Sequence, residues 1–174
     1  MKYSIAFFFL LAFHYLHAAD SLVVHSPDKR IDVTVYYKDK LSYSIRYLGK
    51  PILLPSVIDL QLQNGKRLSD DLRLSKRSIR SFNGTIISPV PEKRKEIPDV
   101  YNELSLQFKD PFTLLLRVYN DGVGYRIVTR FKDSIIIKNE VAEFSFPEHK
   151  KVLLPLFEPR DGDPFITSYR NYIN

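Results

Sequence analysis

The side chains in this sequence that could carry out chemistry are mainly carboxylates. Glu103, Glu140 and Glu143 stand in or beside stretches in which apolar and polar residues alternate. A pair of carboxyl groups facing each other across a sugar ring can hydrolyse a glycosidic bond. Any of these glutamates could line such a cleft, although a solvent-facing position on a strand is the commoner role. Their spacing alone assigns no acid and no base.

Other kinds of catalytic or metal site find little support in the residues. Beyond residue 19 the chain has two histidines, His25 and His149, whereas a zinc site needs several ligands at set spacings. The "DGD" at residues 161–163 resembles part of a calcium loop without its terminal glutamate, so a solvated turn is the better interpretation. Motifs for a nucleophilic serine, a P-loop or a dinucleotide site do not occur. No catalytic group and no metal ligand can therefore be named.

The stretch "RVYNDGVGYRI", residues 117–127, is the most distinctive in the chain. Asn120, Asp121 and Gly122 tolerate positive φ and lie between two apolar runs, which predicts a tight hairpin with Gly122 at positive φ. The turn accounts for the glycine. It does not account for the arginines on either side, Arg117 and Arg126.

The elements that must position these residues are predicted to be β-strands. Apolar and polar residues alternate almost throughout, with frequent Tyr, Phe, Val and Ile, and turn residues divide the runs. This pattern predicts an all-β fold, an antiparallel sandwich or a barrel. The predicted strands are residues 30–37, 41–48, 57–63, 104–108, 112–119, 124–131, 134–138 and 142–146. Turns are expected at residues 38–40, 49–51, 64–65, 83–84, 110–111 and 121–122.

Two regions break the alternation. Residues 66–80 hold six basic and two acidic side chains, which is typical of a long loop or of an edge strand protected by charge. Residues 155–174 contain three prolines and one glycine without a clear pattern, and the sequence ends there as if the domain were interrupted.

The first 19 residues are predicted to be a cleaved signal peptide. Lys2 precedes a short apolar run, and the small residues Ala18 and Ala19 follow it. The run is about half the ~20 residues that a membrane-spanning helix needs, and a buried N-terminal helix is the alternative. The chain has no cysteine, which excludes a lipid-anchored cysteine and disulfides and favours the bacterial periplasm over a small secreted eukaryotic domain.

The net charge of the whole chain is +6, and removal of residues 1–19 would leave 25 basic against 20 acidic residues. The basic residues are dispersed among acids and have few aromatic neighbours, so a solvated face is favoured over a nucleic-acid groove. Residues 20–174 are long enough for one domain with a substantial core.

Four segments in order resemble the N-terminal domain of glycoside hydrolase family 97, which comprises exported bacterial α-glucosidases and α-galactosidases. They are residues 26–56, beginning Ser-Pro-Asp; 101–108, "YNELSLQF"; 117–127; and 139–146, "NEVAEFSF". The resemblance covers most of residues 22–157. Residues 66–98 are more basic than the family pattern, and beyond Pro155 only "SYRNY" matches.

This resemblance implies a galactose-mutarotase-like super-sandwich, normally followed by a (β/α)8 barrel and a small β domain. In the family, the barrel supplies most of the calcium site and both catalytic carboxylates, and the N-terminal domain completes the pocket. A barrel takes about 250 residues, so it is expected to be missing from this chain. The calcium-binding glutamate of the N-terminal domain is expected beyond residue 174, and the chain by itself is expected to be inactive.

The family segments also supply candidate substrate-binding residues. The candidates are Tyr101, Asn102, Glu103, Asn120 and Asp121, expected to be structural or at the rim of a pocket for an α-linked oligosaccharide. The alternative is a free-standing periplasmic sandwich that binds carbohydrate or a protein partner. Glucoside against galactoside specificity, and retention against inversion, depend on the barrel and stay open.

Overall fold

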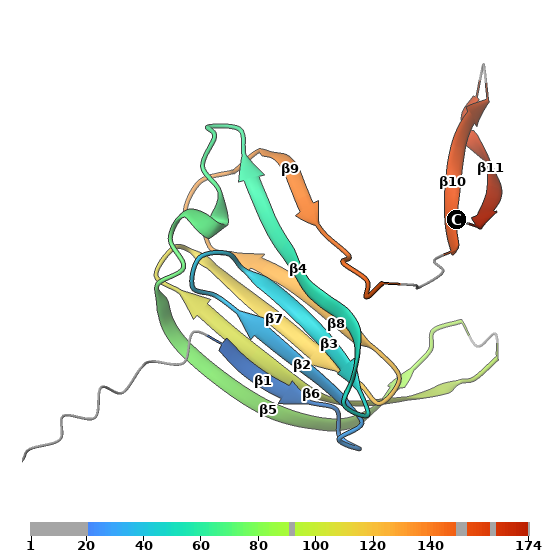
Figure 1. Cartoon of the computed structure of the whole chain (residues 1–174), viewed down its shortest axis with the longest axis horizontal. Coiled ribbons are helices and arrows are strands. Elements are labelled where there is room, and N and C mark those ends of the chain that lie inside the picture. The colour runs from blue at the N-terminus through green and yellow to red at the C-terminus, as the bar shows by residue number, and fades with distance from the viewer. Residues whose placement is uncertain (1–20, 91–92, 149–152, 161–162, 174) are drawn as a thin grey trace, which may run out of the picture.

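The structure is a computed structural model that describes residues 21–90, 93–148, 153–160 and 163–173. The described residues form eleven β-strands and one short 3-10 helix, so the predicted all-β sandwich is confirmed (Figure 1). The predicted signal peptide, His149 and most of the "DGD" segment lie outside the described residues. No helix among the described residues is long and apolar enough to cross a membrane.

Two antiparallel sheets form the sandwich. The first has the order β1-β2-β3-β4-β9 and the second the order β5-β6-β7-β8. The first contains β1 Ser21–His25, β2 Ile31–Tyr36, β3 Ser42–Tyr47, β4 Lys50–Leu62 and β9 Ile137–Ala142. The second contains β5 Leu74–Ile87, β6 Glu96–Phe108, β7 Phe112–Val118 and β8 Val123–Thr129. The last strands, β10 Leu153–Arg160 and β11 Asp163–Ile173, pair with each other, and η1 spans Leu68–Asp70.

The core lies between the two sheets and is built by alternate residues of each strand. On β2 every second residue from Ile31 to Val35 is buried, and on β7 every second residue from Phe112 to Val118. The rings of Phe108 and Phe112 stack in this core with centroids 4.6 Å apart. Full burial of such a side chain stabilises the fold by about 1.5–3 kcal/mol. Each core strand therefore has apolar residues at alternate positions, which is the pattern that predicted most of the strands.

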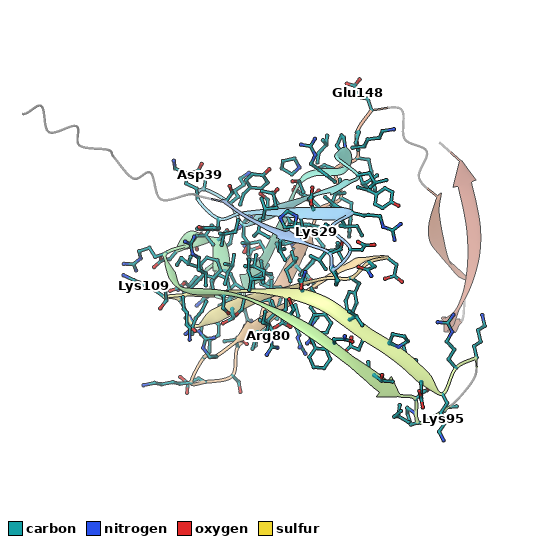
Figure 2. All side chains as sticks on the ribbon, turned by 90° about the horizontal axis from the view of Figure 1, so that it is seen from below. Lys29, Asp39, Arg80, Lys95, Lys109 and Glu148 are labelled. Carbon is teal, nitrogen blue, oxygen red and sulfur yellow. The ribbon has the colours of Figure 1, made fainter. Side chains whose placement is uncertain are left out.

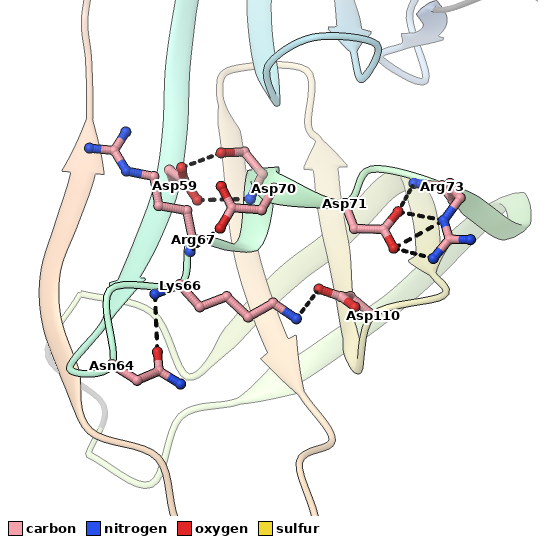
Figure 3. Close-up of polar contacts among 9 residues, drawn as sticks. Asp59, Asn64, Lys66, Arg67, Asp70, Asp71, Arg73 and Asp110 are labelled. Atoms are coloured by element: carbon pink, nitrogen blue, oxygen red, sulfur yellow. Dashed lines mark hydrogen bonds and ion pairs between the residues drawn. The ribbon is translucent and has the colours of Figure 1, made fainter.

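The charged region at residues 66–80 contains both of the structures considered for it. Residues before Leu74 form a loop around η1, and those after it belong to β5, which is an edge strand. The buried Asp59 accepts hydrogen bonds from the backbone N–H and the hydroxyl of Ser69, which hold the loop against β4 (Figure 3). The ammonium of Lys66 lies 2.7 Å from Asp110 and joins the loop to the β6–β7 turn.

One predicted turn is absent from the structure. Asn83 and Gly84 lie inside β5, paired with Val100 and Asp99, so the turn predicted there is wrong. A Cβ at Gly84 would lie 2.8 Å from the Phe82 ring, so this glycine makes room for an aromatic side chain and not for a turn.

The hairpin between β7 and β8 is confirmed, with Val118 paired to Val123 and the Tyr119 N–H donating to the Gly122 carbonyl at 2.8 Å. Its predicted positive φ at Gly122 is wrong, because among the described glycines only Gly49 and Gly65 have positive φ, at 77° and 86°. The four-residue connection closes without a left-handed glycine.

Near the C-terminal end of the sandwich, the predicted strands at 134–138 and 142–146 are replaced by one strand. β9 covers Ile137–Ala142 and pairs with the second half of β4 from Ile58 to Leu62. Most of its residues are exposed, so its position follows from pairing with β4 more than from its own apolar pattern. The strands β1, β10 and β11 were not predicted.

Candidate functional site

The candidate site lies on the outer face of the β5–β8 sheet, the face turned away from the core. Leu104 and Leu106 of β6 belong to the core, so the alternating residues Tyr101 and Glu103 point to the opposite face. Both are nevertheless buried, with 4% of Tyr101 and 2% of Glu103 exposed. Side chains from the neighbouring strands must therefore cover them.

Glu103 is covered by two arginines. The register places Arg80 of β5 and Arg117 of β7 directly opposite Glu103, one on each side. The Nε of Arg80 donates to Oε1 of Glu103 at 2.9 Å and its Nη2 lies 2.7 Å from the same oxygen, while the Nε of Arg117 donates to Oε2 at 2.7 Å. Each carboxylate oxygen thus has a cationic partner, which is what a buried charge requires.

These contacts set the pKa of Glu103. Burial alone would raise it, but the hydrogen bond from Arg117 and the positive charges of both arginines outweigh burial and lower the pKa below its ordinary value. The pKa of Arg117 is raised in turn, first by its hydrogen bond to Glu103 and then by one to Tyr119. Glu103 is therefore held as a carboxylate, in the wrong state for a general acid.

Aromatic rings surround this ion cluster. Phe82 of β5 stacks on Tyr101 with centroids 5.2 Å apart, and Tyr119 packs on the other side of Tyr101 at 5.2 Å. The guanidinium of Arg117 lies 4.2 Å from the Tyr101 ring centre, a cation–π contact. We call this set the outer-face cluster. Its members are Arg80, Phe82, Tyr101, Glu103, Arg117 and Tyr119.

A shallow pocket of about 270 Å³ adjoins the outer-face cluster on the β8 side. Its lining includes Arg117, Tyr119 and Arg126 of the edge strand β8. Gly124, which also lines it, has open space where a side chain would be. The pocket is therefore an indentation in the surface of the sheet, with guanidinium and aromatic groups around it.

Asn102 has a different role from its neighbours on β6. Its Nδ2 donates to the His25 carbonyl of β1 at 2.8 Å, and its Oδ1 accepts from the hydroxyl of Ser81 at 2.6 Å. Because β1 belongs to the other sheet, this amide joins the two layers of the sandwich. Asn102 thus serves to hold the sheets together.

Asn120 and Asp121 also separate in the structure. The Oδ1 of Asn120 accepts from the backbone N–H of Asp28 at 3.0 Å, so the β7–β8 corner holds the turn between β1 and β2. Asp121 is exposed in the corner. Of the predicted candidates, Tyr101 and Glu103 meet in the outer-face cluster, and the two asparagines make interlayer or turn contacts.

The turn held by Asn120 contains the Ser-Pro-Asp segment. Ser26 is 1% exposed, and its hydroxyl donates to Asp28 and accepts from the N–H groups of Arg30 and Ile31. The hydrogen bond from Ser26 contributes most to lowering the pKa of Asp28 to about 2, although burial opposes it. Three of the family-like segments, at residues 26–30, 101–103 and 117–122, therefore meet at one end of the sandwich.

The carboxylates considered as an acid and base pair occupy separate places. Glu103 lies beneath the arginines on β6, whereas Glu140 is exposed on β9 in the other sheet. Glu143 accepts a hydrogen bond from the backbone N–H of Val57, inside β4, at 3.2 Å. Within the part of the chain that the structure describes, no three His, Asp or Glu side chains converge to hold a metal ion.

Sequence reasoning missed Arg80 and Phe82 as parts of the candidate site. Both precede Glu103 by about twenty residues in the chain, and Arg80 stood in a basic run interpreted as a solvated face. The signal that could have found them is the register of the β5–β6 hairpin, which sets Arg80 opposite Glu103 and Phe82 opposite Tyr101.

Comparison with known proteins gives the family. The model described as "Glycosyl-hydrolase 97 N-terminal" matches residues 24–171. The retaining alpha-galactosidase of Bacteroides thetaiotaomicron is 33% identical over 160 residues, which are 90% of this chain and 24% of that protein. This chain therefore spans about a quarter of the length of that relative.

Solved structures agree on the fold. A glycoside hydrolase family 97 enzyme of Pseudoalteromonas sp. strain K8 in complex with panose has a TM-score of 0.69 at 22% identity, over 79% of this chain and 22% of that one. A beta-arabinopyranosidase has a TM-score of 0.74 at 22% identity, over 86% of this chain and 26% of that one. In both solved enzymes, the part that matches this sandwich makes up about a quarter of a longer chain.

Proposed function

This chain belongs to the glycosyl hydrolase 97 N-terminal family, and we propose that it is the pocket-completing module of an α-glycosidase. The observation that carries the proposal is the family match over residues 24–171, combined with alignment to only 24% of a retaining alpha-galactosidase. The catalytic domain of such an enzyme is absent from these 174 residues.

The geometry of the site supports a structural or rim role. A glycosidase acid must carry a proton, but the arginines beside Glu103 lower the pKa of its carboxyl. A glycosidase nucleophile must reach the sugar, but both oxygens of Glu103 are engaged and only 2% of the residue is exposed. Glu103 therefore orients Arg80 and Arg117 and does not react itself.

The substrate proposed for the complete enzyme is an α-linked galactoside or glucoside. Support comes from the retaining alpha-galactosidase of B. thetaiotaomicron and from the family 97 enzyme solved with panose. On the present chain, the exposed Asp121 and the pocket beside Arg126 are the features open to a sugar or to a neighbouring domain. The other candidates, Asn102 and Asn120, act by fixing the shape of the rim.

Calcium is expected in the complete enzyme, but the described residues offer no set of ligands for it. No step of the proposed role depends on a metal held by this chain.

The test is an assay of residues 20–174 with activated aryl α-galactosides and α-glucosides, with and without calcium. We expect no turnover above the enzyme-free blank, because hydrolysis needs two opposed carboxyl groups about 5 Å apart for retention or ~6.5–9.5 Å for inversion. Turnover that survives repurification, and that Glu103→Gln, Glu140→Gln or Glu143→Gln abolishes, would overturn the proposal.

A further inference from the structure

The edge strand β5 extends one strand beyond the sheet that packs against it. The amide of Asn102, on β6, reaches the His25 carbonyl of β1 at 2.8 Å, so β1, the last strand of its sheet, lies over β6. No strand in the described part of the chain lies over the adjacent β5. Ile79 pairs with the core residue Leu104 and therefore faces inward, yet it is 55% exposed. The inner face of β5 is thus an uncovered shelf beside β1.

Two adjoining hollows occupy the space above this shelf. Their volumes are about 260 and 200 Å³, and Ile79 lines both. The first is also lined by Leu22 of β1 and Arg77 of β5, and the second by Val24 of β1 and Ser81 of β5. We call the space between these five residues the open slot. Figure 2 shows the molecule from this side, with the blue strands of one sheet above the green β5 of the other.

The edge of β1 that faces the open slot presents backbone hydrogen-bonding groups. In an antiparallel strand, the N–H and C=O of one residue point to the same side, and successive residues point to opposite sides. The N–H of Ser26 donates to the Ile31 carbonyl of β2, whereas the His25 carbonyl accepts from Asn102 on the other side. The N–H and C=O of Val23, two residues before His25, therefore face the open slot, where no described strand pairs with β1.

β1 is also the edge strand with the least protection against further pairing. The other edge strands of the sandwich, β5, β8 and β9, each contain charged side chains, whereas the sequence of β1, "SLVVH", contains no Lys, Arg, Asp, Glu or Pro. Charged residues and prolines are the usual means by which exposed edges avoid additional strands. An unprotected edge beside an uncovered shelf fits a strand that adds to the sheet by β-augmentation.

A second copy of this chain does not fit the open slot through its own β1. Antiparallel pairing of two β1 edges relates the copies by a two-fold axis perpendicular to the sheet. Each β5 would then project beneath the β1 of the other copy, into the space that the β6 of that copy already fills. The open slot therefore admits a single extended strand and excludes the β1 edge of another copy.

The residues around the open slot indicate the chemistry of the added strand. Leu22 and Ile79 offer apolar surface to its inward side chains. Arg77 lines the first hollow and Lys29 the second, and no Asp or Glu among the described residues lines either. Carboxylates near the two ends of the strand would therefore be attracted. No Tyr, Phe or Trp of the described chain lines the hollows, so a sugar ring finds no flat surface there.

We propose that the open slot binds an extended peptide segment of another protein, which pairs with the free edge of β1. Alternate apolar side chains of the peptide would cover Ile79, and its carboxylates would lie toward Arg77 and Lys29. The peptide would become the sixth strand of the sheet that contains β1. This inference is independent of the proposed function, because it involves neither a sugar nor a catalytic domain.

The test uses a fluorescein-labelled peptide with the sequence Glu-Thr-Val-Thr-Val-Thr-Val-Thr-Glu, in which valines and both carboxylates share one face of a strand. Its binding to this chain is measured by fluorescence anisotropy. We expect saturable binding, and a control peptide with Lys in place of both Glu should bind at least about fivefold more weakly. Absence of saturable binding of the first peptide up to about 1 mM overturns the proposal.

Variants of this chain test strand pairing and charge separately. Val23→Pro removes an N–H from the free edge without removing a β1–β2 hydrogen bond, and should weaken binding at least about tenfold. The control Val23→Thr keeps the N–H and a β-branched side chain, and should bind within about twofold of the native chain. Arg77→Glu should weaken binding about fivefold, whereas Lys76→Glu, the same change of charge on the opposite face of β5, should alter it less than about twofold.

The outcomes decide between occupants. Equal affinity of the native chain and a Val23→Pro variant that is folded by circular dichroism overturns strand pairing. If Val23→Pro does not fold, Ile79→Ser is compared with Ile86→Ser on the opposite face of β5, and equal affinities of these two variants overturn the proposal. Self-association of the chain in sedimentation velocity that Ile79→Ser abolishes would make a second copy the occupant, and displacement of the peptide by panose would make it a sugar; either overturns the proposal.

Discussion

At the scale of single residues, the most informative feature is a charged side chain that is buried on the face of a sheet turned away from the core. Glu103 faces away from the core, yet Arg80, Arg117 and the aromatic rings remove it from solvent. A buried ion needs partners for its whole hydrogen-bonding capacity, and here two strands provide them. Loss of either the charge or one of its partners should therefore lower the stability of the domain.

We expect Glu103→Gln to lower the free energy of unfolding by about 1–3 kcal/mol, because a neutral amide leaves the two guanidinium groups poorly paired. The comparison is Glu140→Gln, an exposed glutamate on β9, which should change it by less than about 0.5 kcal/mol. Urea unfolding of residues 20–174 measures both. Equal effects of the two substitutions would mean that the buried ion cluster contributes little to stability.

The pH dependence of stability follows from the lowered pKa of Glu103. A carboxyl whose pKa is lower in the folded than in the unfolded state stabilises the fold fully above the unfolded value, about 4.3 for glutamate. This contribution is lost as the pH falls through the lower, folded pKa. The stability difference between the native chain and Glu103→Gln should therefore be constant above about pH 5.5 and shrink in more acidic solution. A difference that grows on acidification would contradict the lowered pKa.

In the complete enzyme, the same substitution separates a positioning role from a catalytic one. The residue matching Glu103 in the retaining alpha-galactosidase, replaced by Gln, should reduce thermal stability or raise KM more than it reduces kcat. The reason is that both oxygens are occupied by arginines in this chain. A large loss of kcat with unchanged Tm and KM would assign Glu103 a direct catalytic role.

At the scale of elements, two of the glycine-containing turns use glycine differently. Gly65 has a φ of 86° in the turn after β4, whereas Gly122 has no left-handed backbone in the turn between β7 and β8. Neither has an atom within 4 Å of the place where a Cβ would be. The pair therefore isolates backbone strain from steric crowding.

Gly65→Val should destabilise the domain by about 1–2 kcal/mol, because a β-branched residue is strained at positive φ. Gly122→Val should cost less than about 0.5 kcal/mol, because Gly122 has no positive φ and no atom lies within 4 Å of the place of its Cβ. Thermal melts of the two variants give the comparison. A larger loss for Gly122→Val than for Gly65→Val would show that the β7–β8 corner depends on glycine for another reason.

At the scale of the whole molecule, we propose that residues 20–174 act in the periplasm after export. The order of Lys2, an apolar run and the small residues Ala18 and Ala19 supports cleavage near Ala19. Mass spectrometry of the chain produced for export in a bacterial host should find an N-terminus at or next to Asp20. Periplasmic protein that retains Met1 would rule out this cleavage.

The sequence by itself determined the fold class and the family. Alternation of apolar and polar residues is present in the strands of any sandwich, because each strand needs one apolar face whichever neighbours it pairs with. Core strands such as β2 and β7 were predicted on this basis. Corners with Asn, Asp and Gly mark hairpins for local reasons, so the β7–β8 connection was also predictable. The family-like segments lie in the same parts of the chain that the family model matches.

Only the tertiary structure decided what the candidate residues do. Alternation shows that Tyr101 and Asn102 face opposite ways, but it does not show that Asn102 reaches His25 on the other sheet. It also does not show that Arg80, far away in the chain, comes to lie opposite Glu103. Such contacts depend on strand register and sheet packing, which are set by the sum of many pairings and not by any local run of residues. For the same reason the sequence suggested a turn at Gly84, whereas in the structure Gly84 lies within β5 and its missing side chain leaves room for the Phe82 ring.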